Sequence, residues 1–254
     1  MPGPAEIAIL SAVALAAGTV DAIAGGGGLL TVPALLAAGL PPHLAIATNK
    51  GQSVFGSFAA AIRFGRAGML DRRRALVAFP AGVAGALAGA AAVLVVPPGT
   101  LRPVVLVLLV AAALFVGLRR PRSAPAEPAP ARRGTPALTA AIALAIGAYD
   151  GFFGPGTGTF LIVAFVALLG DGLARASASA KVVNFASNLA ALVLFASRGV
   201  VVWRIALPMA AAQLAGGWIG AHLAIRRGDA LVRRVAVTVT LALVLKLAWD
   251  MRGG

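Results

Sequence analysis

The sequence holds 254 residues, of which 60% are hydrophobic and 12% charged, and its formal net charge is +14. A water-soluble domain carries about 25% charged residues, so this composition excludes an ordinary soluble protein and indicates a chain that lies in lipid. Most arginines stand in short clusters between apolar runs, which favours contact with a bilayer of anionic headgroups and argues against binding to nucleic acid.

The first half of the sequence alternates long apolar runs with polar or basic connections. The run 29–38 follows a glycine cluster and is too short to span, because a helix of this length reaches only about 15 Å. The arginine-rich segment 63–74 is predicted to be a cytoplasmic loop. The runs that are long enough to span are 6–23, 45–62, 75–96 and 101–118.

The second half begins after segment 119–136, which is rich in proline, alanine and arginine and is predicted to be a flexible cytoplasmic linker. Another short apolar run, 159–169, again follows a glycine-rich stretch. The predicted spans of this half are 137–149, 176–196, 205–225 and 232–249.

The two halves repeat each other. Asp21 and Asp150 each stand four residues before a glycine cluster. Lys50 matches Lys181. At the same spacing along the chain several glycines also match, among them Gly85 with Gly216 and Gly89 with Gly220. Duplicated halves with interrupted helices are typical of secondary transporters, whose binding site lies between the repeats.

The sequence therefore predicts an all-α membrane protein with about eight transmembrane helices in two repeats, 1–118 and 137–254, within a single membrane domain. Each repeat is expected to contain a short re-entrant or broken helix after its glycine turn. If the short pieces are re-entrant, the repeats are parallel; if they cross, the repeats are inverted. The distribution of basic residues does not decide between these arrangements, and the length of the short runs favours re-entrant pieces.

Lys50 and Lys181 are the first candidates for a binding site, because a lysine within a span is costly and is retained for a function or for a partner. We predict that they provide positive charge for an anionic substrate. The alternatives are that they extend to the membrane interface or form ion pairs with Asp21 or Asp150. Neighbouring polar residues are predicted to line the pocket or to join helices: Thr48, Asn49, Gln52, Ser53, Asn184 and Asn188.

The glycine clusters are the second candidates. Gly26, Gly27, Gly156 and Thr157 precede short apolar helices, so their N–H groups are expected at helix N-termini, which attract anions. The alternative is a turn that needs glycine only for its backbone freedom. Asp21 and Asp150 are predicted to carry a coupling proton, to neutralise a lysine, or to cap the following helix.

The segments 18–36 (GTVDAIAGGGGLLTVPALL), 39–43 (GLPPH) and 47–50 (ATNK) closely resemble the TauE/SafE family of membrane transporters. The second half is similar to the family at 154–159 (GPGTGT), and the likeness covers almost the whole chain. This resemblance implies a multi-pass permease of the bacterial inner membrane, with relatives associated with sulfite, sulfoacetate and other sulfur-containing organic anions.

We expect a secondary transporter for a small anion such as a sulfur oxyanion, sulfonate or carboxylate. A passive anion channel and a non-transporting membrane subunit are the alternatives, and a homodimer is left open. No enzyme activity, cofactor or metal is expected, because HExxH, GxSxG and nucleotide-binding motifs are absent and cysteine is missing.

Overall fold

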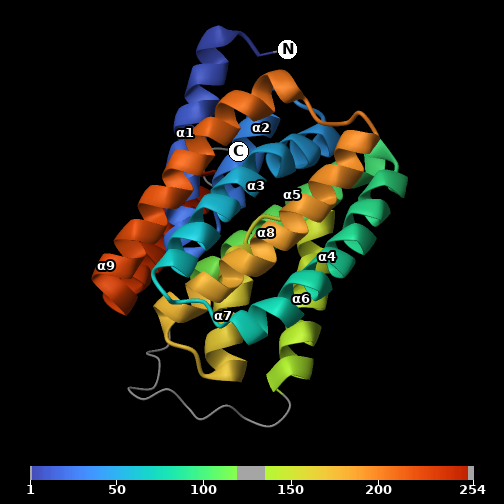
Figure 1. The fold of residues 1–254 in the computed structure, drawn as a ribbon. Helices are drawn as coiled ribbons and strands as arrows, with labels where there is room; N and C mark the ends of the chain where they lie inside the picture. Colours follow the sequence, from blue (N-terminus) through green and yellow to red (C-terminus); the bar gives the residue numbers. More distant parts are fainter. Residues whose placement is uncertain (1, 119–134, 251–254) are drawn as a thin grey trace.

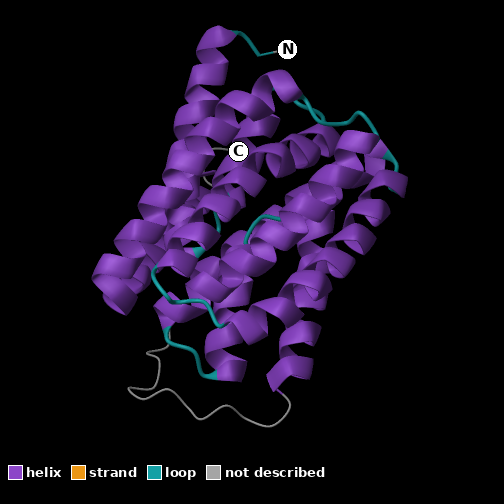
Figure 2. Ribbon diagram, in the orientation of Figure 1, coloured by secondary structure: helices purple, strands orange, loops and turns teal. Residues whose placement is uncertain are grey.

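The computed structural model describes residues 2–118 and 135–250, and this part of the chain is helical, with no strand (Figure 2). Each apolar run predicted from the sequence lies within a helix to within one residue, whereas the predicted linker lies almost wholly outside the described residues. The helices are α1 (Pro4–Ala24), α2 (Gly28–Ala37), α3 (Pro42–Arg66), α4 (Arg72–Val95), α5 (Pro98–Leu118), α6 (Thr135–Phe152), α7 (Thr157–Leu169), α8 (Leu173–Ser197) and α9 (Trp203–Asp250).

Among the described helices, α1, α4 and α8 are long and apolar enough to cross a membrane by length and composition alone. Shorter apolar helices include α2 and α7. The predicted spans 205–225 and 232–249 are joined in α9, which bends sharply at Gly228, where the backbone φ is 59°.

Aspartate side chains cap the starts of two helices. Asp71 caps α4, because its carboxylate accepts hydrogen bonds from the N–H groups of Arg73 and Arg74. The start of α8 is capped from another element, since Leu173 and Ala174 donate to the carboxylate of Asp229 in α9. This contact ties the bend of α9 to the first turn of α8.

The short helix α2 turns the chain back along α1. Gly27 lies against Ala17 and Asp21, whereas Leu35 belongs to the same apolar cluster as Leu10, near the other end of α1. The reversal at α2 and the further reversal before α3 leave α1 and α3 running in the same direction. Both helices pack along the first arm of α9, as Figure 1 shows for α1.

Glycines allow the closest helix contacts, and these contacts occur in equivalent pairs. In the first pair, Gly85 and Gly89 of α4 lie against α6, where a Cβ on Gly89 would come within 1.9 Å of the Ala148 carbonyl oxygen. In the second pair, Gly216 and Gly220 of α9 lie against α1 in the same manner. The predicted matches between the halves are therefore matches in structure, with each half supplying the helix that covers the other.

The equivalent helices of the two halves run in opposite directions. Along α3 and α8, Lys50 contacts Asn188 whereas Phe58 contacts Phe185, so these two helices are antiparallel. This is the orientation that inverted halves would give, and it disagrees with the parallel arrangement that the preferred re-entrant interpretation implies. The physical reason is that each short helix adds one reversal of direction, which gives each half an odd number of segments.

Equivalent positions at the two ends of the bundle are held together by different kinds of contact, a salt bridge at one end and apolar packing at the other. Arg74 of α4 forms a salt bridge with Asp171 in the connection between α7 and α8. At the opposite end, the equivalent residues are Ile205 and Leu40, which lie in one buried apolar cluster. Burial raises the pKa of the Asp171 carboxyl above its ordinary value, and the Arg74 guanidinium opposes this rise.

Candidate functional site

The two glycine turns meet at the centre of the bundle. A Cβ on Gly25 would come within 2.2 Å of the Thr159 backbone nitrogen, and one on Gly28 within 3.0 Å of the Pro155 Cα. Gly25 and Gly154 also have φ of 77° and 99°, which side chains disfavour. The α1–α2 and α6–α7 pairs are thus two helical hairpins whose tips touch.

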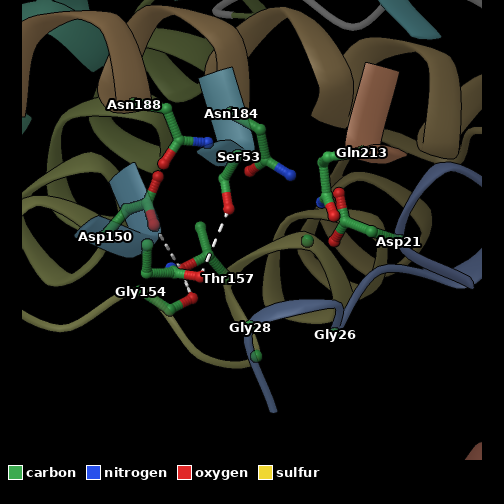
Figure 3. Close-up of a pocket in the computed structure, with 13 residues that line it drawn as sticks. Asp21, Gly26, Gly28, Ser53, Asp150, Gly154, Thr157, Asn184, Asn188 and Gln213 are labelled. Carbon is green, nitrogen blue, oxygen red and sulfur yellow. Dashed lines mark hydrogen bonds between the residues drawn. The ribbon is translucent and has the colours of Figure 1, made fainter. Parts of the chain in front are cut away.

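A polar pocket lies beside these tips (Figure 3). In this view Asn188 and Asp150 stand on one side and Asp21 and Gln213 on the other, with Asn184 and Ser53 between them. The empty space among these residues is about 340 Å³, part of which is open to the surroundings. Its lining residues are Asp21, Gly26, Gly28, Asn49, Ser53, Asp150, Gly154, Gly156, Thr157, Gly158, Asn184, Asn188 and Gln213.

The lysines form ion pairs that cross between the halves. Lys50 Nζ lies 2.6 Å from Asp150 Oδ1, and Lys181 Nζ lies 2.7 Å from Asp21 Oδ2. Both lysines are fully buried and neither is among the residues that line the pocket. The lysines therefore form the ion pairs that were one of the predicted alternatives. In each pair the carboxylate belongs to the pocket lining and the ammonium does not.

Two asparagines of the lining are held with their oxygens turned to protein donors. Asn188 Oδ1 accepts a hydrogen bond from Lys50 Nζ at 3.0 Å. Asn49 Oδ1 accepts from Thr31 at 2.6 Å and from Gln52 at 2.8 Å. Within the described part of the chain, the side-chain nitrogen of neither asparagine donates to another residue. The site therefore presents amide N–H donors to its interior.

Other predicted site residues have separate places. Thr157 donates to Asp150 Oδ1 and to the Gly154 carbonyl, so it joins the glycine turn between α6 and α7 to the Lys50–Asp150 pair. Gly27 donates to Asp21 Oδ1 at 3.1 Å, which is a capping contact of the kind the sequence suggested. Thr48 accepts from the Val202 N–H, away from the pocket lining, and Gln52 supports Asn49 from behind.

The sequence analysis missed Gln213. It lies in α9 with 2% of its surface exposed, lines the pocket, and packs against Gly18 and Gly56. The available signal was one amide side chain within the otherwise apolar run before Gly216. No group of three or more histidine, aspartate and glutamate side chains that could hold a metal occurs among residues 2–118 and 135–250.

Comparisons with known proteins agree on one family. The family model described as "Sulfite exporter TauE/SafE" matches residues 10–247. The chain is 38% identical to the probable membrane transporter protein ORF9 of Sinorhizobium sp over 245 residues, covering 96% of this chain and 93% of the relative. It is 37% identical to the probable membrane transporter protein YfcA of Escherichia coli K12 over 253 residues, covering 100% and 93%. No solved structure matches.

Proposed function

The chain belongs to the sulfite exporter TauE/SafE family of membrane transporters, and from this premise we propose that it is a secondary transporter for a small anion. Its setting is the inner membrane of a bacterium, which the bacterial relatives support. The substrate class is a sulfur-containing oxyanion or an organic sulfonate or carboxylate, and the binding site is the pocket between the hairpin tips.

The observation that carries this proposal is the excess of hydrogen-bond donors that face a neutralised pocket. Each of the two pocket carboxylates is balanced by a buried lysine. The side-chain nitrogens of Asn49 and Asn188 are left without a protein acceptor among the described residues. Anions are bound by such converging N–H groups. The buried oxygens of Asn184 and Gln213, which also line the pocket and accept from no residue of the described chain, can be exchanged for N–H donors by a flip of each amide.

The glycine turns add backbone donors. The N–H groups of Gly26 and Gly28, at the start of α2, donate to no other residue of the described chain. The same holds for Gly156 and Gly158 at the start of α7. A helix start carries about half a positive charge, so two of them at the pocket favour an anion without a full charge in contact with it.

Inverted halves with interrupted helices suit alternating access, in which one half rocks against the other around a fixed central site. We assign α1, α3, α4, α5, α6, α8 and the two arms of α9 to the membrane, with α2 and α7 as the short arms of hairpins that each reverse the chain once more, so that each half has five segments. The repeats are 1–118 and 137–254. The arginine-rich end that contains segment 63–74 is cytoplasmic, following the positive-inside rule.

In this proposal the lysines act through the carboxylates. Lys50 neutralises Asp150 and fixes the amide of Asn188, while Lys181 neutralises Asp21. The net charge of the pocket is close to zero while both ion pairs are formed. It becomes positive when a carboxylate is protonated or separates from its lysine.

The test begins with purified protein and a panel of sulfite, sulfate, thiosulfate, methanesulfonate, sulfoacetate and acetate. At least one anion is expected to raise the Tm in proportion to the logarithm of its concentration. The same anion should then enter proteoliposomes with a rate that saturates. Currents that rise linearly with voltage and do not saturate would instead indicate a channel.

Asn188→Ala is expected to weaken binding of that anion by about 10- to 150-fold, because a hydrogen bond to a charged partner contributes about 1.5–3 kcal/mol. Titration of the Tm shift, or isothermal calorimetry, measures the change. Ser57→Ala is the matched control, since Ser57 is at the equivalent position in α3 but donates only to the carbonyls of Ser53 and Val54. Equal affinity in both variants would remove Asn188 from the site.

A further inference from the structure

The two ion pairs differ in how completely the protein satisfies their carboxylates. Asp150 accepts from Lys50 and Thr157 on one oxygen and from Ser187 on the other, and its side chain is only 4% exposed. Both oxygens of this carboxylate therefore accept from protein donors, three in all. Such a pair is a fixed part of the fold.

Asp21 is held less completely and is open to the pocket. Its carboxylate accepts from Lys181 on one oxygen and from the Gly27 N–H on the other, and its side chain is 19% exposed. Lys181 has Asp21 as its one hydrogen-bond partner among the described residues, whereas Lys50 has two. The Asp21–Lys181 pair can therefore separate with less loss than its counterpart.

Few charged groups surround Asp21. Lys181 of α8 is the charged side chain in contact with it, and the neighbouring Gln213 of α9, with the glycines of α2 and α7, carries no charge. Across the pocket the Lys50–Asp150 pair is already balanced. Protonation of Asp21 would thus leave Lys181 as the one uncompensated charge at the pocket within the described residues.

We propose that Asp21 is the proton-binding site that couples transport, and that it takes up a proton when the anion binds. This inference rests on the proposed function. The carboxylate gains a proton from water and becomes neutral, while Lys181 keeps its proton, and its positive charge then balances the negative charge of the anion. One proton and one negative charge enter the site together, so the local charge does not change. The transporter therefore moves the anion and a proton in the same direction.

The test measures proton uptake directly. Detergent-purified protein in a weakly buffered solution at pH 7 is mixed with whichever panel anion binds, preferably methanesulfonate or thiosulfate, which do not titrate there. A pH indicator should report about one proton taken up for each anion bound. Asp21→Asn should bind the anion with no proton uptake, and the difference between the two proteins removes any proton that the anion itself releases.

Two controls separate Asp21 from carboxylates in general. Glu6→Gln removes an exposed carboxylate at the start of α1, and the double variant Lys50→Met with Asp150→Asn removes the other ion pair while leaving no buried charge unpaired. Glu6→Gln should retain the parent's affinity for the anion and its proton uptake. The double variant should bind the anion more weakly, because Lys50 orients Asn188, but it should keep the ratio of protons taken up to anions bound. In proteoliposomes, an inward pH gradient should drive accumulation in the parent and in Glu6→Gln, but not in Asp21→Asn.

Each outcome decides the inference. Anion binding without proton uptake in the parent, or equal uptake in the parent and in Asp21→Asn, overturns the role of Asp21 but leaves the anion site intact. If proton uptake were lost in the double variant but retained in Asp21→Asn, the proton-binding site would be Asp150, and the role of Asp21 would again be overturned. Failure of every panel anion to bind would overturn the proposed function, and the coupling role with it.

Discussion

Lys50→Met is expected to lower the stability of the folded protein by about 3–5 kcal/mol, because it leaves the Asp150 carboxylate buried without its cation. The free energy of unfolding in mixed micelles, or the Tm in one detergent, measures this loss. Adding Asp150→Asn to the same chain should restore most of the stability, because no charge is then left unpaired.

The Lys181–Asp21 pair provides the comparison for this loss of stability. Lys181→Met should cost less than Lys50→Met, because the Asp21 side chain is 19% exposed whereas that of Asp150 is 4% exposed. A Lys50→Met protein as stable as the parent, or a double variant no better than the single one, would show that Lys50 and Asp150 do not depend on each other. Transport need not return with stability, since Lys50 also orients Asn188.

Gly89→Val is the second substitution with a large expected effect. Its first added carbon would lie 1.9 Å from the Ala148 carbonyl oxygen and 2.7 Å from the Phe152 nitrogen, and both of these are backbone atoms that cannot rotate away. Helices α4 and α6 would have to separate, at a cost of about 3 kcal/mol, the upper end of the usual range for overpacking. A lowered Tm and a loss of monodisperse protein in size-exclusion chromatography are the measurements.

Gly220→Val should behave similarly, because Gly220 lies against Thr19 of α1 at the equivalent position, with a contact of 2.3 Å. Gly99→Ala is the control, since no atom lies within 4 Å of the position its Cβ would occupy. If Gly89→Val matched that control in Tm, the close approach of α4 and α6 would not exist in the protein.

The helices and their order could be predicted from the sequence because each apolar run carries its own signal, and the glycine breaks mark the turns. The direction of the halves could not, because ten to thirteen apolar residues are compatible with a return to the same side or with a crossing. That choice depends on how α2 packs along α1, which is a contact between segments.

The candidate site was predicted in part. Asn49 and Asn188, which were predicted as pocket-lining donors, lie in the lining, and the pairing of lysines with aspartates was among the alternatives. The sequence could not show that each lysine takes the aspartate of the other half, since this follows from the inversion. Gln213 was missed because one amide in an apolar helix is usually a local packing contact.

The salt bridge at one end of the bundle and the apolar contact at the other make the two closures respond to different conditions. Arg74 and Asp171 are partly exposed, so their attraction weakens as ionic strength rises and the Debye length shortens. Leu40 and Ile205 are held by burial, which added electrolyte does not weaken and cooling does. A protein whose halves are related by inversion would therefore not divide its time equally between its outward and inward orientations, and the division would shift with the salt content of the compartment that Arg74 faces.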